Sequence, residues 1–577
     1  MKYRPEIDGL RSIAVTAVIL YHAGFLPQGY LGVDIFFVIS GYLITSLIDN
    51  SLNTGSFRFG HFYERRIRRI LPMTLFICLL ALASGYFLML PDDFENLTQS
   101  VIATVLFSNN LLLYFTSGYW DIVNHYKPLL HTWSLGVEEQ FYLIFPVILF
   151  LGHRLFKKIS QKQLLMIVLM ILSLISCYLI GNPKFNFFIV TSRLYQFGAG
   201  ALLVFAVKKY ESRNALPSVV LLLGLIALLV FPFTKILLIN IAVTAVTALL
   251  IYTYRPKAAG YILENPVLVF LGRISFSMYM WHQFIFAFFR QTVSQQISLR
   301  WLLLLFALIV VLSVITYFLI EQPYRNNKKI SSSVLLISTG SVAAMLVCIS
   351  FYYYQRSGVV RDVPELDIYK VRHYERGMHA KYNDRIRMLD KPFSKDNKRK
   401  ILIIGNSFAR DVANMLLENH YADDAEISYI HYSNDVRITE RLQKADLVIF
   451  GSPVAPAELS RICSEYSIPD EHLLVIGSKG FGEHNGLVFN SASYPERCKT
   501  AVDPDPLIAK TNAIYGAVKK SCYVDLMALL MRPDGRIPLF TPACKLISQD
   551  GRHLTKAGAV YLGSLLARDT NFRLRFP

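Results

Sequence analysis

The sequence predicts a polytopic α-helical membrane bundle of about eleven spans, followed by an extracytoplasmic α/β domain. Apolar segments long enough to cross a bilayer recur between residues 11 and 353, and the chain then becomes polar. The polar part contains short apolar runs, each followed by a turn and a helical pattern, which is typical of parallel strands. Hydrophobic residues make up 53% of the chain and charged residues only 17%, so much of its surface is expected to contact lipid.

Composition divides the chain into four segments. We assign residues 1–330 to a membrane domain and 331–353 to an additional transmembrane helix. Residues 354–397 are charged and lack apolar periodicity, which is typical of a linking extension. Residues 398–577 form the predicted α/β domain.

The topology follows from the expected spans and the loops between them. The expected spans lie at residues 11–27, 32–50, 70–90, 136–152, 163–181, 187–207, 217–233, 235–254, 266–290, 299–321 and 331–353. We leave residues 99–115 out, because counting them would place the basic loops on opposite sides of the membrane. The basic loops then share the side of Lys2 and Arg4, which predicts a cytoplasmic N-terminus and an outer location beyond about residue 355.

The net charge of +18 does not indicate a nucleic-acid partner. Many of the Lys and Arg residues lie in short clusters between apolar segments, as in the cytoplasmic loops of membrane proteins. The region before the first apolar segment contains Glu6 and Asp8, and no small-residue cleavage site follows. We therefore expect the first segment to remain as an anchor.

Two ionisable residues share the first predicted span. Arg11 and His22 are eleven positions apart, so in a helix they lie on nearly the same face, about 16 Å apart along the axis. A neutral imidazole can take the proton of a hydroxyl that attacks a thioester, which makes His22 a candidate general base. The alternative is an interfacial histidine without a chemical role.

More titratable residues are expected near the outer face. His131, Glu138 and Glu139 begin one span, and Asp34 begins another. Titratable groups that converge at one face are candidates for a supporting site. The alternative is that they cap helix ends and pair with one another.

A dense basic run is expected on the cytoplasmic side, at Arg65, Arg66, Arg68 and Arg69. Guanidinium groups bind phosphate oxygens bidentately, so this run is a candidate clamp for the phosphates of coenzyme A. The alternative is retention of positive loops in the cytoplasm, which needs no ligand.

Six motifs in order give the membrane domain a family resemblance. The motifs are Tyr3 to Arg11 with Asp8 and His22, Gly32 to Gly41, Arg65 to Arg69, His131 to Tyr142, Ser275 to His282, and Glu321-Gln322-Pro323. Together they resemble the acyltransferase-3 membrane family. The resemblance implies transfer of an acyl group from cytoplasmic acyl-coenzyme A to a carbohydrate on the far side. It also implies that Arg11 and His22 are essential and that the Arg65 to Arg69 run lies on the donor side.

The polar domain offers a second candidate site. Residues 401–404 form an apolar strand that a Gly405-Asn406-Ser407 turn connects to a helical pattern, which would place Ser407 at a helix N-terminus. His553 could serve Ser407 as a base with Asp550 orienting it. The alternative is a non-catalytic binding domain in which Ser407 only caps the helix.

These two motifs resemble the SGNH hydrolase family over residues 398–570. Two departures stand out. Asn406 occupies the place of the usual Asp, and no clear Gly-x-Asn-Asp supplies a side chain to the oxyanion hole. Asn485 is a candidate substitute, and the backbone N–H of Ser407 with a neighbouring glycine is another.

Four cysteines fall in the polar domain, namely Cys463, Cys498, Cys522 and Cys544. They allow two disulfides in three pairings, among which the sequence does not choose. We expect no metal site, because no close Cys-x-x-Cys or Cys/His cluster occurs.

The fusion of the two domains resembles bacterial O-acetyltransferases that modify lipopolysaccharide O-antigen or peptidoglycan. We therefore expect a protein of the bacterial cytoplasmic membrane that uses acetyl-coenzyme A and a lipid-linked or surface glycan. Ser407 is expected to carry the acetyl group as an ester, or else the membrane half transfers it directly. An esterase that removes acyl groups and an acyl or lipid transporter are the alternatives, although no paired Gly/Pro-broken repeats favour a transporter.

Overall fold

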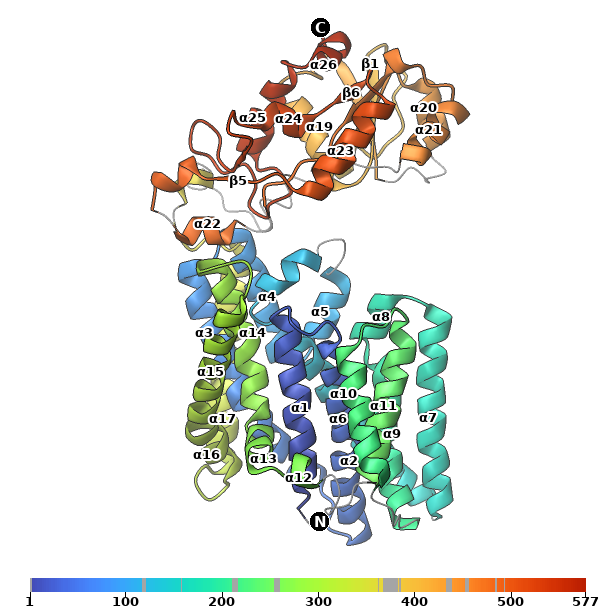
Figure 1. Cartoon of the computed structure of the whole chain (residues 1–577), viewed down its shortest axis with the longest axis vertical. Helices are drawn as coiled ribbons and strands as arrows, with labels where there is room; N and C mark the ends of the chain where they lie inside the picture. The colour runs from blue at the N-terminus through green and yellow to red at the C-terminus, as the bar shows by residue number, and fades with distance from the viewer. Residues whose placement is uncertain are drawn as a thin grey trace. The chain divides into compact units, whose positions relative to one another are not determined.

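The computed structural model describes residues 3–116, 121–156, 158–209, 216–253, 260–361, 363–366, 382, 385–431, 438–451, 456–482, 485–491 and 493–577. The chain forms two compact units (Figure 1). The first, here called the helical unit, comprises Met1–Phe87, Leu97–Arg290 and Gln296–Phe351. The second, here called the α/β unit, comprises Leu88–Asn96, Gln291–Gln295 and Tyr352–Pro577.

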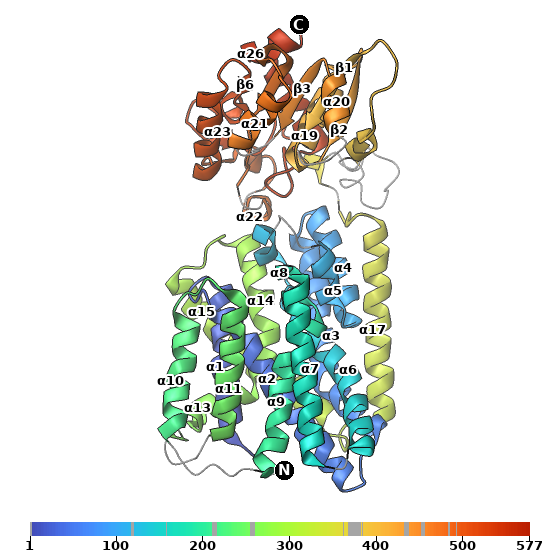
Figure 2. The same ribbon diagram turned by 90° about the vertical axis from the view of Figure 1, so that its right-hand side faces the viewer.

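The first 355 residues are organised as helices, most of them running roughly alongside one another (Figures 1 and 2). They are α1 (Pro5–His22), α2 (Gly32–Asn53), α3 (Phe59–Leu88), α4 (Pro91–Val105), α5 (Asn109–Thr116), α6 (Thr132–Leu155), α7 (Ile159–Ile180), α8 (Pro183–Phe188), α9 (Val190–Lys209), α10 (Leu216–Val230), α11 (Ile236–Thr253), α12 (Gly260–Leu263), α13 (Pro266–Arg273), α14 (Ser275–Thr292), α15 (Leu299–Thr316), α16 (Gln322–Arg325) and α17 (Ser332–Gln355).

Several of these helices meet the requirements of a membrane span. Among the described residues, seven helical segments are long and apolar enough to cross a membrane: Gly29–Asn53, Phe59–Leu88, Thr132–Leu155, Ile159–Ile180, Ile236–Thr253, Leu299–Arg325 and Ser332–Gln355. Three other expected spans correspond to α1, α9 and α10, whereas the expected span 266–290 is divided between α13 and α14. The protein is thus a multi-pass membrane protein, as predicted, while the count of eleven spans stays a prediction.

The doubtful span at residues 99–115 is not one continuous helix. Helix α4 ends at Val105 and α5 begins at Asn109. Between them Phe107 has a φ of 51°, a left-handed conformation that interrupts a right-handed helix. The buried side chains of Asn109 and Asn110 follow immediately. This break agrees with leaving the segment out of the span count.

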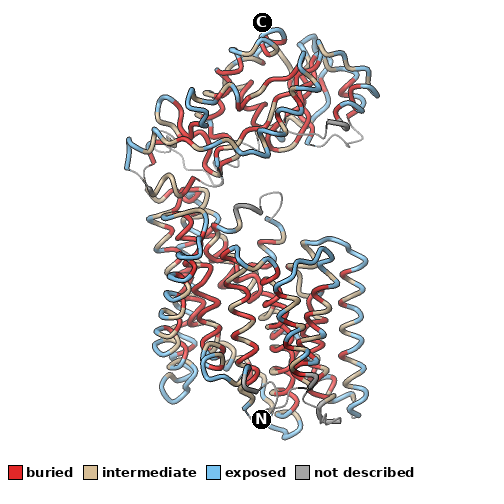
Figure 3. The backbone as a smooth tube through the Cα atoms, in the orientation of Figure 1, coloured by how far each residue is buried: buried red, intermediate tan, exposed pale blue. Residues whose placement is uncertain are grey.

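Helices α2 and α9 form a tightly packed centre of the helical unit. A Cβ atom on Gly41 of α2 would lie 2.1 Å from the carbonyl oxygen of Phe197, and one on Gly200 of α9 would lie 2.0 Å from that of Val38. Small residues allow such close helix contacts in membranes. Burial also distinguishes the central helices from the outer ones (Figure 3). In the apolar stretch of Gly29–Asn53, 78% of the residues are buried, whereas in that of Ile159–Ile180 only 17% are buried. Helix α7 therefore offers most of its side chains to lipid.

The α/β unit contains a parallel sheet buried on both faces. Its strands are β1 (Arg399–Ile404), β2 (Ala425–Ile430), β3 (Leu447–Gly451), β4 (Leu473–Ile476) and β6 (Tyr523–Val524), in the order β2-β1-β3-β4-β6. Strands β5 (Ala501–Val502) and β7 (Ile537–Pro538) form a separate antiparallel pair.

Helices cover both faces of this sheet. One face packs against α19 (Ser407–Glu418), α24 (Leu526–Leu530), α25 (Lys556–Leu566) and α26 (Thr570–Arg575). The other packs against α20 (Ile438–Lys444), α21 (Pro456–Glu465) and α23 (Pro506–Val518). A short helix, α22, spans Gly486–Ser491. Along β1, Ile401 and Ile403 enter the first core while Leu402 and Ile404 enter the second. This two-sided burial explains the uninterrupted apolar runs that predicted parallel strands.

The strand order reverses next to the start of α19. The chain crosses from β1 to β2 on one side and then to β3 on the other, and ligands of open α/β sheets bind where the order reverses, at the carboxyl ends of the strands. Gly405 lies at this point with a φ of 141°, and a Cβ atom there would lie 2.3 Å from the carbonyl oxygen of Gly451 at the end of β3. Glycine is therefore required where β1 turns toward Ser407.

Candidate active sites

A cavity of about 260 Å³ lies inside the helical unit. Three of its lining residues are arginines, Arg11 from α1 and Arg66 and Arg69 from α3. Most of the remaining wall is apolar or aromatic. The other lining residues are Val33, Phe36, Phe37, Ile39, Ser40, Leu43, Ile44, Leu47, Ile70, Ser134, Leu135, Glu138, Tyr142, Ser275, Phe276 and Tyr279. The cavity thus combines cationic groups with space for an apolar chain.

The four arginines of the predicted clamp do not share one environment. Arg66 and Arg69 line the cavity, whereas Arg65 is exposed. Arg68 is buried, forms an ion pair with Glu64 at 2.8 Å and donates hydrogen bonds to the carbonyl oxygens of Tyr324 and Ile330. Arg68 therefore has a structural role, and the candidate donor site keeps two of the four.

Arg11 is held at the cavity by Asp8. Its Nη1 lies 3.3 Å from Asp8 Oδ1, and the other carboxylate oxygen of Asp8 accepts a hydrogen bond of 2.7 Å from the hydroxyl of Tyr3. Since Arg11 and His22 both belong to α1, the expected placement of the two residues on one helix is confirmed.

Glu138 lines the same cavity, whereas Glu139 is not among its described lining residues. The Oε1 atom of Glu138 accepts hydrogen bonds from the hydroxyls of Ser40 and Tyr142. The guanidinium of Arg66 lies 5.6 Å from the centre of the Tyr142 ring. Polar groups of α2, α3 and α6 therefore meet on the cavity wall.

Three buried histidines form a cluster in the helical unit. The ring of His282, from α14, lies 5.2 Å from the ring of His22 and 5.2 Å from that of His131, measured between ring centres. His282 Nδ1 lies 2.6 Å from the carbonyl oxygen of Tyr279. Among the described residues, His22 Nδ1, both ring nitrogens of His131 and His282 Nε2 have no hydrogen-bond partner. Buried unpaired nitrogens are costly, and they leave acceptor and donor capacity for a substrate.

Tyr279 connects the cavity to the histidines. It lines the cavity, and its ring centre lies 5.2 Å from that of His131 and 5.3 Å from that of His282. Its hydroxyl donates to the carbonyl oxygen of His131 at 2.9 Å and shares a hydrogen bond of 2.6 Å with Ser134 Oγ. A continuous series of contacts therefore runs from the arginine-lined cavity to His22.

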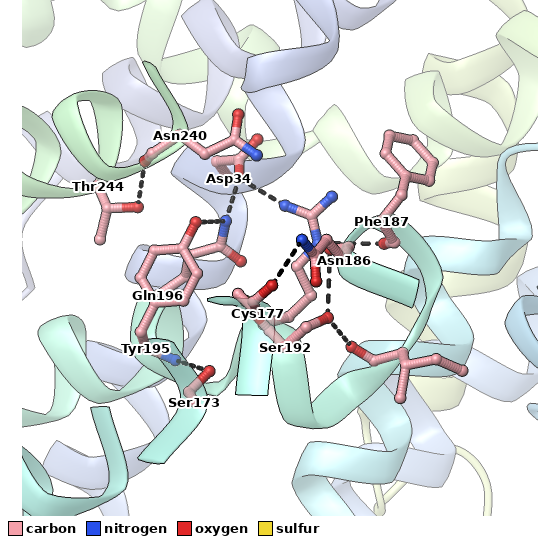
Figure 4. A network of polar contacts seen from close by, with 12 residues as sticks. Asp34, Ser173, Cys177, Asn186, Phe187, Ser192, Tyr195, Gln196, Asn240 and Thr244 are labelled. Carbon is pink, nitrogen blue, oxygen red and sulfur yellow. Dashed lines mark hydrogen bonds and ion pairs between the residues drawn. The ribbon is translucent and has the colours of Figure 1, made fainter. Parts of the chain in front are cut away.

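Asp34 belongs to a different polar network (Figure 4). Its Oδ1 atom lies 3.0 Å from Arg193 Nη1 and also accepts a hydrogen bond from Gln196. The side chains of Asp34 and Arg193 are both 3% exposed. Asp34 is not among the described residues that line the cavity. Three of the titratable groups expected near the outer face therefore lie in different places: His131 in the histidine cluster, Glu138 on the cavity wall and Asp34 in this buried ion pair.

The α/β unit brings Asp550 and His553 together. Asp550 Oδ2 lies 2.5 Å from His553 Nδ1, while Asp550 Oδ1 accepts from the backbone N–H groups of Arg552 and His553 at 2.9 and 2.8 Å. A carboxylate at Nδ1 fixes the tautomer that presents Nε2 as a base. This is the arrangement expected from the spacing of the two residues.

Ser407 is buried at the first position of α19. Asn406, not Ser407, caps this helix, since its Oδ1 accepts from the backbone N–H of Phe408 at 2.9 Å. The ring of Phe408 lies 6.2 Å from that of His553, so the start of α19 and the His553 loop are adjacent. The capping alternative for Ser407 is therefore wrong, because Asn406 fills the capping position, as an Asp would do equally well.

Asn485 supports the loop that carries Asp550. Its Nδ2 donates to the carbonyl oxygen of Ser548 at 2.5 Å, and its side chain is buried. Ser548 Oγ in turn donates to Asp550 Oδ1 at 3.1 Å. The structure thus gives Asn485 a bracing contact, and its expected part in an oxyanion hole stays a prediction.

One disulfide joins Cys498 and Cys544 in the α/β unit. Cys463 and Cys522 are buried free thiols. Only one of the two disulfides that four cysteines would allow is therefore present.

A family comparison covers the helical part of the chain. Residues 4–320 match the model of the acyltransferase domain of the acyltransferase-3 family. The chain belongs to this family. This confirms the resemblance seen in the six motifs of the membrane domain.

Curated relatives of this family member occur in Staphylococcus aureus. A protein of strain MSSA476 that carries an O-acetyltransferase name is 32% identical over 326 residues, which is 50% of this chain and 51% of the relative. The O-acetyltransferase OatA of strain NCTC 8325 is 33% identical over 316 residues, again 50% of this chain and 51% of the relative. The chain spans about half the length of these relatives. No solved structure matches the chain.

The sequence motif Ser275 to His282 contains two residues of the acyltransferase-domain site for which the sequence alone predicted no function. Tyr279 and His282 are three positions apart in the Ser275 to His282 motif, and in α14 they lie on one side, toward His131. Their i, i+3 spacing was the available signal. What the sequence lacked was the packing of α14 against α1 and the start of α6.

Proposed function

We propose that the protein is an acyltransferase that moves the acetyl group of acetyl-coenzyme A across the bacterial cytoplasmic membrane. The acceptor is a hydroxyl of a cell-surface glycan. One observation carries this proposal: the arginine-lined cavity reaches Tyr279, which touches the cluster that contains His22. The family and the O-acetyltransferase names of the relatives support the class of reaction.

The cavity suits the donor because of its charge and its apolar wall. Arg11, Arg66 and Arg69 supply guanidinium groups for the phosphates of coenzyme A. Phe36 and Phe37 line the space available to the pantetheine arm and the acyl group. In the proposed topology of eleven spans, the N-terminus and the basic loops face the cytoplasm, so that this donor site is reached from the side where acetyl-coenzyme A is made.

His22 acts as the general base in the proposed transfer. It takes the proton of the attacking hydroxyl, the hydroxyl oxygen bonds to the thioester carbon, and the bond from that carbon to sulfur breaks. The proton then passes to the leaving thiolate. His131 and His282 surround His22 with nitrogens that relay this proton or bind the hydroxyl.

Ser407 is the proposed second acceptor, in an extracytoplasmic α/β unit. His553, oriented by Asp550, takes the Ser407 proton as the Ser407 oxygen bonds to the carbonyl carbon of the acetyl ester formed at His22. The bond from that carbon to the first hydroxyl oxygen breaks, and this oxygen takes the proton from His553 and leaves as a hydroxyl. A glycan hydroxyl then attacks the Ser407 ester and releases Ser407. Direct transfer from the helical unit to a lipid-linked glycan is the shorter route, and it leaves Ser407 dispensable.

We take the O-antigen of lipopolysaccharide as the acceptor, with peptidoglycan as the alternative. The test is mass spectrometry and proton NMR of both glycans from a deletion strain that expresses the wild-type chain, His22→Ala or Ser407→Ala. Membrane insertion of each variant is checked by immunoblot. Loss of glycan acetyl groups in both variants supports the relay, and loss only in His22→Ala supports direct transfer. Unchanged acetylation in the deletion strain and in both variants contradicts the proposal.

An esterase is the second candidate, because the Asp550–His553 pair beside the start of α19 also suits ester hydrolysis. The same measurement separates the two functions. An esterase predicts that glycan acetylation rises in the deletion strain and in Ser407→Ala, whereas the proposed transferase predicts that it falls.

A further inference from the structure

A buried ion pair lies beneath the candidate site of the α/β unit and belongs to none of the motifs discussed above. Asp411 is in α19, one helical turn after Ser407, and Lys479 follows strand β4. Their side chains are 0% and 3% exposed, and Lys479 Nζ lies 2.6 Å from Asp411 Oδ2. Residues four apart share a helix face, so Asp411 lies on the Ser407 side of α19.

The same carboxylate oxygen also holds the histidine loop. Asp411 Oδ2 accepts a hydrogen bond of 3.3 Å from the backbone N–H of Leu554, the residue after His553. Asp411 Oδ1 has no hydrogen-bond partner among the described residues. The carboxylate of Asp411 is therefore fixed through one oxygen. This oxygen connects helix α19 to Lys479, which follows β4, and to the loop that contains His553 and Leu554.

Lys479 makes a further contact beside the site. Its ammonium lies 4.5 Å from the centre of the Phe408 ring. Phe408 follows Ser407 in the sequence, and its ring centre lies 6.2 Å from that of His553. The cation thus contacts the first turn of α19 through Phe408, beside the ring of His553.

The energetics favour a positioning role over a stabilising one. Burying two charges costs desolvation that their attraction only partly returns, and apolar pairs of similar size often stabilise a fold as well or better. Removing one partner leaves the other charge buried and uncompensated. A contribution to stability is thus a weak explanation for this buried pair. The contacts of its two members with each other, with the Leu554 N–H and with the Phe408 ring instead hold the segments that carry Ser407 and His553.

We infer that the Asp411–Lys479 ion pair is a positioning device that sets Ser407 relative to His553. The inference rests on the proposed function in one respect, since it takes Ser407 as a nucleophile and His553 as its base. Neither Asp411 nor Lys479 is assigned contact with the acyl group.

The test uses the full-length protein in lipid nanodiscs and a fluorophosphonate probe. In the labelling reaction the Ser407 oxygen bonds to phosphorus, the phosphorus–fluorine bond breaks, fluoride leaves and His553 takes the Ser407 proton. The second-order labelling rate is measured between about pH 5 and 9 for wild type, Lys479→Met, Lys479→Arg, Asp411→Asn and Ser407→Ala. Thermal unfolding of each variant is recorded alongside.

Arg441→Met provides the matched control. Arg441 is 2% exposed, pairs with Asp390 at 2.9 Å and belongs to α20, which covers the other face of the sheet from α19. This variant therefore loses a buried cation of the same unit without touching the proposed device.

We expect Lys479→Met and Asp411→Asn to slow labelling by about 100-fold, the cost of misplacing a catalytic group by about 1 Å. They should also lose the rise in rate with pH that a histidine base produces. Lys479→Arg should recover at least about tenfold of the loss, because it keeps the charge. Arg441→Met should keep the wild-type pH profile. Wild-type labelling rates in Lys479→Met, or a loss equal to that of Arg441→Met, would overturn the inference.

A second readout needs no reaction at Ser407. Amide hydrogen exchange of peptides containing Leu554 should be about tenfold faster in Lys479→Met, because the Leu554 N–H loses a fixed acceptor. Unchanged exchange contradicts the positioning device. Absence of labelling in the wild-type protein, with Leu554 exchange altered as expected, contradicts the nucleophile role of Ser407 and leaves the device supported.

Discussion

On helix α3, the spacing of the arginines decides which of them reach the cavity. Arg66 and Arg69 are three positions apart and line it together, as residues on one helix face do. Arg68 faces the carbonyl oxygens of Tyr324 and Ile330 instead, and Arg65 is exposed. The sequence predicted a basic cluster but not this division, because the division depends on which neighbours α3 meets.

Arg69 and Arg65 therefore make a matched pair for mutation. Arg69→Lys should weaken acetyl-coenzyme A binding by about 10- to 100-fold, since a hydrogen bond to a charged group is worth about 1.5–3 kcal/mol and Lys cannot bind phosphate bidentately. Isothermal titration with acetyl-coenzyme A in nanodiscs measures this. Arg65→Lys should bind as the wild type does, and equal losses in both variants would remove the basis for a donor site at the cavity.

His431 gives the α/β unit a pH-sensitive residue near Ser407. Its Nδ1 lies 3.1 Å from the hydroxyl of Tyr429, which donates to the carbonyl oxygens of Gly405 and Asn406. Partial desolvation, with Arg387 and Arg410 nearby, lowers the pKa of the exposed His431 below its usual value, so a small effect on stability is expected. The unfolded chain thus binds a proton more readily than the folded chain does.

Stability of the α/β unit should therefore fall as the pH drops below about 6.5, the pKa of an unfolded histidine, toward the lower folded value. His431→Gln should flatten this part of the curve, because the substituted side chain does not titrate. Thermal unfolding of both proteins between about pH 7.5 and 5 checks this. Parallel curves for the two proteins would assign the pH dependence to other groups.

Among the elements, α2 and α9 depend on glycine for their contact. The sequence predicted both helices from apolar length, but nothing in the composition of α9 shows that the backbone of Gly200 lies against Val38. Contacts between distant parts of the sequence were likewise not predicted at the two candidate sites. Asp550 and His553 were predicted because they are close in sequence, whereas His22, His131 and His282 meet only after three helices pack.

Gly200→Ala should destabilise the helical unit, because its Cβ atom would lie 2.0 Å from the carbonyl oxygen of Val38 and the helices would have to separate. A cost of about 1–3 kcal/mol is expected for such overpacking. Gly224→Ala in α10 is the control, since nothing lies within 4 Å of its Cβ position. Thermal unfolding in detergent should show a lower midpoint for Gly200→Ala alone, and equal midpoints would contradict the close contact.

The Cys498–Cys544 disulfide links a short 3-10 helix, Glu496–Lys499, to a segment of the α/β unit 46 positions further along the chain. Closing a loop of this length stabilises a fold by about 4 kcal/mol. Replacing both cysteines by serine should therefore lower the unfolding midpoint strongly, as measured by denaturant titration. Peptide mapping without reduction should show this cross-link and free thiols at Cys463 and Cys522. A cross-link between Cys463 and Cys522 would contradict the observed pairing.

At the scale of the whole molecule, the two units present two different chemistries. The helical unit holds most of the family match over residues 4–320, together with the cationic cavity and the histidine cluster. The α/β unit holds a doubly covered parallel sheet with Ser407 where the strand order reverses. Composition and periodicity predicted a helical bundle followed by an α/β fold, because the sequence changes from long apolar segments to short apolar runs typical of strands.

In the proposed mechanism, an acetyl group from cytoplasmic acetyl-coenzyme A reaches a glycan on the other side of the membrane by way of His22. The most direct test reconstitutes the full-length protein in proteoliposomes, supplies radiolabelled acetyl-coenzyme A only on the side of Arg69, and places lipopolysaccharide or peptidoglycan on the opposite side. We expect labelled glycan with the wild type and none with His22→Ala, although both proteins bind acetyl-coenzyme A. Equal labelling by the two proteins, or none by a wild type that binds the donor, would contradict this mechanism.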